Sequence, residues 1–111
     1  MNFSKNDTSL IVRNFELETS KETLSEEELL ELLTQQVAYM IEYKLDYLLS
    51  MLYRLDVLEH KINYALSPLA ADPPAVGLAK LILERQKQRI ATKAAYREKT
   101  NEEDDFEGWD W

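Results

Sequence analysis

Apolar residues recur at intervals of three, four and seven positions over a long stretch that runs from Leu29 to Leu55. This spacing places them along one side of an α-helix. Ser25 stands just before the stretch and Glu28 follows three positions later, in the order of a capping box. The pattern therefore predicts a first helix over about residues 26–53.

The apolar arc of this first helix covers close to half of its circumference. A helix that rests on one neighbour needs an apolar stripe of only about 100°. We therefore expect the helix to contact two surfaces, and its second apolar stripe is a candidate for self-association. The members of this stripe are Leu29, Leu33, Met40, Tyr47 and Met51.

Two further helices are indicated after the first. Asp56, followed by Glu59, predicts the N-cap of a short helix over about residues 57–66. Asp72 and the two prolines after it predict the start of a last helix over about residues 73–99, since proline is tolerated in the first helical turn. The fold class expected is all-α, a long antiparallel helical hairpin with a short connecting helix.

Residues 1–24 are polar apart from one apolar patch over residues 10–17. The patch does not alternate cleanly, so a short strand, a docked arm and a lack of order all remain open. We favour a flexible arm that is loose by itself and docks on another surface.

Without the arm and the C-terminal tail, residues 25–99 remain to build a core. Single cores of about 70–80 residues rarely supply much stability by themselves. The sequence has no cysteine, so a disulfide is excluded, and oligomerisation is the usual remedy. We therefore expect two hairpins to form a four-helix-type bundle as a homodimer.

Charge is distributed unevenly along this acidic chain, whose net charge is −8. Arg85, Arg89, Lys93 and Arg97 recur every four residues on the last helix and form a basic stripe. Such a stripe could contact the phosphates of a nucleic acid. We favour a structural role instead, in which the stripe faces the acidic start of the first helix across the hairpin.

The C-terminal tail, residues 100–111, holds six acidic residues, no basic residue and three aromatic rings. We expect a disordered tail whose rings anchor in a partner's pocket while the acids steer the encounter. The candidate partner-binding residues are Phe106, Trp109, Trp111, Asp104 and Asp105. A solubilising end, or a clamp that folds back onto the basic stripe, are the alternatives.

The remaining chemistry is sparse. His60 is the single histidine, and no spacing of carboxylates around it supplies a third metal ligand. We expect no cofactor, no metal and no catalytic site. The N-terminal residues do not resemble a signal peptide, charges interrupt the most apolar stretch, and we expect a cytoplasmic protein that does not enter a membrane.

The function expected from these patterns is that of a non-enzymatic protein-interaction protein, an adaptor or regulatory subunit with an unidentified protein partner. The alternative is a nucleic-acid-linked regulator that uses the basic stripe, with the acidic tail as a competitor.

Overall fold

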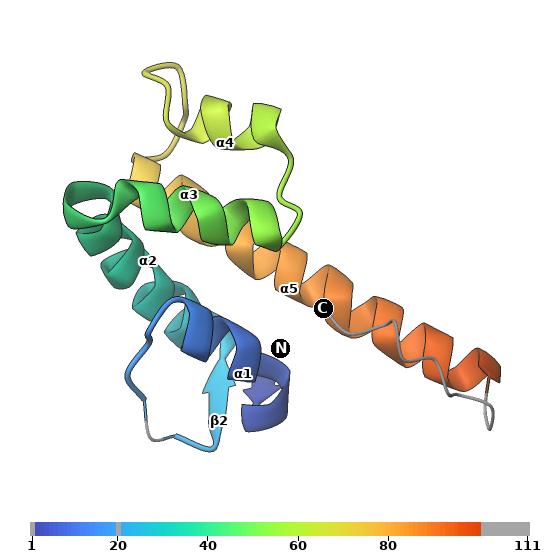
Figure 1. The fold of residues 1–111 in the computed structure, drawn as a ribbon. Helices are drawn as coiled ribbons and strands as arrows, with labels where there is room; N and C mark the ends of the chain where they lie inside the picture. The colour runs from blue at the N-terminus through green and yellow to red at the C-terminus, as the bar shows by residue number, and fades with distance from the viewer. Residues whose placement is uncertain (1, 20, 101–111) are drawn as a thin grey trace.

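The computed structural model describes residues 2–19 and 21–100, and its ribbon is mostly helical (Figure 1). The elements are β1 (Asn2–Ser4), α1 (Lys5–Asn14), β2 (Thr23–Ser25), α2 (Glu26–Tyr43), α3 (Leu45–Arg54), α4 (Glu59–Ala65) and α5 (Pro74–Thr100). The expected all-α class is compatible with this content, with a two-stranded sheet as a small addition. None of the described helices is long and apolar enough to span a membrane.

The N-terminal segment, expected as a flexible arm that docks on another surface, forms a strand and a helix that pack on the core of the same chain. Strand β1 pairs antiparallel with β2, with Phe3 opposite Leu24. Helix α1 begins with a capping box between Ser4 and Asp7. Ile11 of α1 and Phe3 of β1 are both buried in the core. The box has Asp where the common form has Glu or Gln, which weakens the signal in the sequence.

Helices α1 and α3 end with the same turn. The second residue after each helix, directly behind the C-cap residue, has a left-handed backbone, with φ 57° at Glu16 and φ 65° at Asp56. The next amide donates to a carbonyl five residues earlier, as in a Schellman motif. These bonds join Leu17 to Val12 at 3.0 Å and Val57 to Leu52 at 3.1 Å. Asp56 thus terminates α3 and is not the predicted N-cap of α4, whose N-cap is Leu58.

The predicted helix over residues 26–53 is interrupted at Lys44, where φ is −143° and ψ is 48°. The interruption is one residue long, because Lys44 still donates to Met40 and still accepts from Leu48. Helix α3 leaves α2 at a sharp angle (Figure 1). A straight helix of this length would extend about 42 Å, whereas the turn brings Leu48 and Leu52 into the core.

Helix α5 makes its most extensive contact with α2. Pro73 precedes α5 and accepts a hydrogen bond from Gly77 at 2.9 Å, so the helix starts one residue later than predicted. Lys87 of α5 contacts Glu26 at the start of α2, with 2.8 Å between Nζ and Oε2. The acidic start of α2 therefore meets a base of α5, although Lys87 lies beside the predicted basic stripe.

Two glutamates at the start of α2 have lowered pKa values. The hydrogen bond from Lys87 lowers the pKa of Glu26 below its ordinary value. The pKa of Glu28 is lowered by its hydrogen bond from Lys21 and then by the backbone amide of Ser25. Ser25 and Glu28 form the predicted capping box, because Glu28 N–H also donates to Ser25 Oγ at 3.1 Å.

The predicted self-association stripe lies inside the single chain. Leu29, Leu33 and Met40 are fully buried, and Met51 is buried as well. Tyr47 is 37% exposed, and its hydroxyl donates to the carbonyl of Asn14 at 2.8 Å. Four of these five residues are therefore already covered by the rest of the same chain, and self-association through the stripe stays a prediction. The N-terminal segment and α3 bury more of the core than the sequence pattern indicated.

Candidate functional site

The predicted partner-binding residues of the tail, Phe106, Trp109, Trp111, Asp104 and Asp105, lie outside the described residues.

The predicted basic stripe is not one exposed surface. Arg85 is partly buried, and its Nε donates to the carbonyl of Leu55 at 2.8 Å. Arg89 is buried, whereas Lys93 is exposed. The side chain of Arg97 lies outside the described part of the chain. The first two bases therefore serve contacts within the fold.

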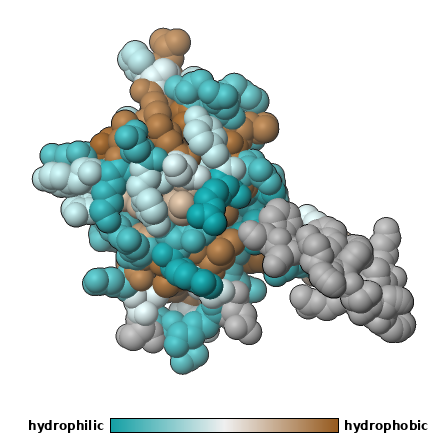
Figure 2. Space-filling view, in the orientation of Figure 1, coloured by the Kyte–Doolittle hydropathy of each residue, from teal (hydrophilic) through white to brown (hydrophobic). Residues whose placement is uncertain are grey.

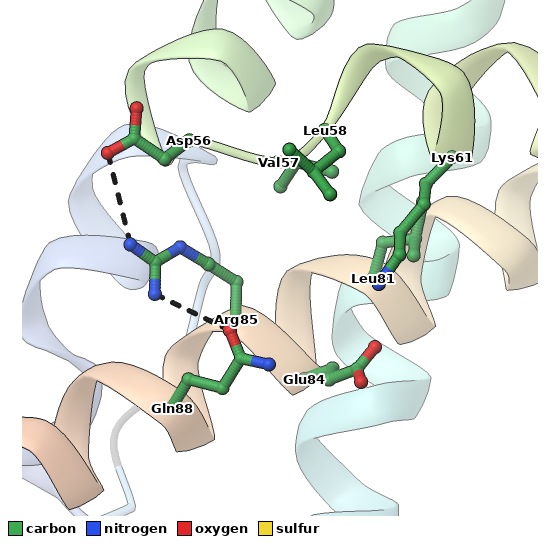
Figure 3. Close-up of a pocket in the computed structure, with 8 residues that line it drawn as sticks. All are labelled: Asp56, Val57, Leu58, Lys61, Leu81, Glu84, Arg85 and Gln88. Atoms are coloured by element: carbon green, nitrogen blue, oxygen red, sulfur yellow. Dashed lines mark hydrogen bonds and ion pairs between the residues drawn. The ribbon is translucent and has the colours of Figure 1, made fainter.

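A groove follows the line where α4 packs on α5. It consists of two adjoining hollows of about 350 Å³ and 190 Å³. Lys61 and Leu81 line both hollows, so the two hollows adjoin at these residues. Figure 3 shows its smaller end, where Val57 and Leu58 lie on one side and Leu81 and Arg85 on the other.

Close packing of small residues defines the larger hollow. A Cβ atom on Gly77 would lie 3.3 Å from the Cβ atom of Ala65, so α4 and α5 approach almost backbone to backbone there. Ala70 and Ala71 also line this hollow, and their short side chains leave its volume open. The groove therefore exists because small side chains meet at one end of two helices.

The loop between α4 and α5, residues 66–73, is held by hydrogen bonds from its own neighbourhood. The hydroxyl of Tyr64 donates to the carbonyl of Leu69 at 3.2 Å. Ser67 Oγ donates to the carbonyl of Tyr64 at 2.8 Å and accepts from the amide of Leu69 at 3.2 Å. This wall of the groove is therefore shaped by local contacts.

Large apolar side chains surround the groove in exposed positions. Leu69 is 82% exposed, and Leu58 and Tyr64 are each 54% exposed. In Figure 2 apolar atoms reach the surface at the top of the molecule, where Figure 1 places α4 and the loop that follows it. A contiguous exposed apolar patch is a common mark of a protein interaction site.

The charges of the groove are mostly paired. Lys80 Nζ lies 3.0 Å from Asp72 Oδ2, and Arg85 lies 3.9 Å from Asp56. Lys61 and Glu84 are exposed and make no ion pair with another described residue. Lys61 lies at the middle of the groove, where a negatively charged group of a ligand could pair with it.

The single histidine of the chain lies at the groove. His60 lines the larger hollow. Within residues 2–19 and 21–100 no group of three or more histidines, aspartates or glutamates is placed to hold a metal ion. The groove itself presents apolar side chains and, at its centre, the ammonium group of Lys61.

Sequence reasoning missed this groove. A signal was present in Leu69, an apolar residue placed directly after Ser67 and Pro68 in a predicted turn. Turns of this kind are usually polar, so a leucine there suggests either a buried loop or an exposed contact. The position of Gly77 opposite Ala65 could not be inferred, because it depends on how α4 folds back on α5.

A third hollow, of about 270 Å³, separates α1 from α5. It is lined by more polar groups, among them Gln86, Arg89 and Lys93. Gln86 Nε2 donates to the carbonyl of Asp7, which ties this hollow to the contact between the two helices. We therefore take the α4–α5 groove as the candidate site.

Comparison of the chain with family models, with curated proteins and with solved structures found no match.

Proposed function

We propose that this chain is a non-enzymatic helical protein-interaction protein that receives a short segment of a protein in the α4–α5 groove. The observation that carries the proposal is the exposed apolar side chains at the groove. Leu58 and Tyr64 line it and are each 54% exposed, and Leu69, which precedes the lining residue Ala70, is 82% exposed. Exposing large apolar side chains in one region is costly in solution and is typical of a surface that a partner covers.

The chemistry of the groove indicates what kind of segment fits. The larger hollow, lined by Ala65, Ala70, Ala71 and Leu81, suits one large apolar or aromatic side chain. Lys61 lies beside it without an ion pair among the described residues, which favours a carboxylate next to the aromatic ring. The proposed ligand is therefore a short acidic-aromatic peptide segment.

The C-terminal tail is a segment of this class. Phe106, Trp109 and Trp111 alternate there with acidic residues that include Asp104 and Asp105. We propose that the tail acts as a docking element, with the rings as anchors and the acids as steering charges. The chain would then carry both a groove that binds such segments and a tail that binds in the groove of a partner.

Two alternative assemblies have less support. A homodimeric four-helix-type bundle needs an exposed apolar stripe on the first helix, and that stripe is in the core of the single chain. A nucleic-acid interface needs a row of exposed bases, and Arg89 is buried while Arg85 hydrogen-bonds to Leu55.

A peptide titration tests the proposal. Isotope-labelled full-length protein is titrated with short peptides that carry one tryptophan flanked by acidic, neutral or basic residues, and amide shifts are followed by NMR. We expect saturable shifts at Ala65, Ala70, Gly77 and Leu81, with the tightest binding for the acidic peptide. Absence of saturable shifts in the groove with every peptide would overturn the proposed function.

A further inference from the structure

We propose that the α4–α5 groove of one copy binds the C-terminal tail of a second copy, so that the chain self-associates head to tail. This inference rests on the proposed function and names the partner of the same site. It commits to residues 101–111, whose acidic and aromatic composition matches the apolar hollow and the central Lys61.

The geometry of α5 argues for a second copy over the chain's own groove. Gly77 and Leu81 line the groove near the start of α5, and the helix continues to Thr100. The stretch from Gly77 to Thr100 is about 35 Å long at 1.5 Å per residue. The larger hollow, which would take the aromatic ring, and the start of the tail therefore lie at opposite ends of the same helix, whereas the smaller hollow extends along α5 to Gln88.

The tail of the same chain has almost no length to spare over this distance. When it is fully extended, the stretch from Thr100 reaches about 30 Å to Trp109 and about 37 Å to Trp111. To reach its own groove, the chain would also have to reverse direction at the end of α5, which shortens its reach. A second copy has no such limit, because its tail can approach the groove from solvent.

A contact of this kind has a defined symmetry. Groove and tail are different surfaces, so the contact is heterologous and leaves one free groove and one free tail on each pair. The expected products are therefore chains or closed rings whose mass grows with concentration. None of the residues of the predicted self-association stripe lines the α4–α5 groove. A contact at the groove therefore leaves the core of each copy intact.

The sequence supplies a reporter for the contact. The chain has two tryptophans, Trp109 and Trp111, and both belong to the tail. Tryptophan emission moves to shorter wavelength when an indole leaves water. The emission of the full chain, excited where tyrosine does not absorb, therefore reports the surroundings of the tail without any label.

The first experiment follows tryptophan emission and light-scattering mass over a wide range of protein concentration. Salt is kept near physiological strength, because copies with a net charge of −8 repel one another at low ionic strength. We expect the mass to rise and the emission to shift in parallel. An emission that does not change with concentration would overturn the inference, whether it indicates a tail in water or a tail in its own groove.

Matched charge reversals locate the contact. Lys61→Glu changes the centre of the groove, and Lys93→Glu makes the same change on an exposed position of α5. We expect Lys61→Glu to weaken assembly about tenfold or more, as loss of a central contact does, and Lys93→Glu to leave it nearly unchanged. Weakening by Lys93→Glu alone would instead assign the tail to the basic end of α5 and overturn the inference.

A mixing experiment tests the head-to-tail arrangement directly. The Lys61→Glu variant keeps its tail, and the double variant Trp109→Ala with Trp111→Ala keeps its groove. At a concentration where the parent assembles and Lys61→Glu alone does not, each variant by itself should stay monomeric, whereas an equimolar mixture should form a one-to-one complex. If the mixture stays monomeric while both variants are folded by circular dichroism, the inference is wrong.

The outcomes separate the inference from the proposed function. If acidic-aromatic peptides shift the groove in the NMR titration but the full chain shows no assembly, the partner is another protein and only the inference fails. If no peptide binds in the groove, the proposed function itself fails.

Discussion

Gly77 and Ala65 face each other so closely that a Cβ atom on Gly77 would lie 3.3 Å from the Cβ atom of Ala65. This distance is at the tight end of ordinary carbon contacts. It sets how near α4 lies to α5, and the groove follows the line of this contact. The contact between Gly77 and Ala65 therefore holds α4 against α5 and also sets the shape of the candidate site, because both residues line the larger hollow.

Substitutions at Gly77 should separate helix propensity from packing. Gly77→Ala gains about 1 kcal/mol of helix propensity and loses part of it to the tight contact, so its stability should stay within about 1 kcal/mol of the parent. Gly77→Leu should destabilise by about 1–3 kcal/mol because it pushes α4 away. Urea unfolding measures both values, and a Gly77→Leu variant as stable as Gly77→Ala would show that α4 does not pack as described.

Glu16 and Asp56 share the left-handed position at the ends of α1 and α3, and glycine should be preferred at both. A residue with a Cβ atom pays about 1–2 kcal/mol in this conformation, and glycine costs about 0.5–1 kcal/mol of chain entropy. Glu16→Gly and Asp56→Gly should therefore stabilise by up to about 1 kcal/mol, less the weak ion pairs to Lys44 and Arg85.

The matched control for these glycine variants is valine at the same positions. A β-branched residue is disfavoured in the left-handed region, so Glu16→Val and Asp56→Val should both lower the midpoint of thermal unfolding. If valine and glycine gave the same midpoint, the two Schellman turns would not form in solution.

The starts of α2 and α5 were the most predictable part of the fold, because their signals are local. Ser25 and Glu28 stand three residues apart and make the capping box that the sequence indicated. The prolines at the start of α5 act in the same way, through their own backbone geometry. These features depend on neighbours in sequence and need no knowledge of the tertiary structure.

The break at Lys44 and the docking of residues 2–24 depend on distant contacts. No proline or glycine marks Lys44, and the helical pattern continues through it, so only the packing of α3 on the core explains the turn. Phe3 lies opposite Leu24 because β1 pairs with β2, and α1 separates these two strands in the sequence. The wide apolar arc of residues 26–53 was correctly identified, but the chain's own N-terminal segment covers part of it.

Leu33 offers a test of where that apolar arc is buried. Leu33→Ala should reduce the free energy of unfolding by about 2–5 kcal/mol, because a fully buried leucine is replaced by a cavity. In a single-chain core the loss should be independent of protein concentration. A loss that disappears as concentration rises would instead place Leu33 in an interface between copies.

Phe15 tests the folded state of the N-terminal segment. It is fully buried after α1, so Phe15→Ala should destabilise by about 3–5 kcal/mol. The exposed neighbour Glu18 supplies the control, since Glu18→Ala should change stability by less than about 0.5 kcal/mol. Equal stabilities of the two variants in urea would indicate a segment that does not pack on the core.

Acid should weaken the start of α2 through Glu26. The hydrogen bond from Lys87 lowers the pKa of Glu26 in the folded chain, whereas the unfolded chain has the ordinary glutamate pKa of about 4.3. A lowered pKa means that the unfolded state binds the proton more tightly, so the stabilisation is present above about pH 4.3 and is lost as the pH falls through the lowered folded-state value. Unfolding measured between neutral and acidic pH should therefore show a smaller acid-induced loss of stability in Lys87→Met than in the parent.

The matched variant Lys93→Met removes an equal charge from an exposed position of the same helix and should keep the parent's pH dependence. If both variants changed the profile equally, the cause would be the charge of α5 as a whole, and the contact between Lys87 and Glu26 would have no specific role.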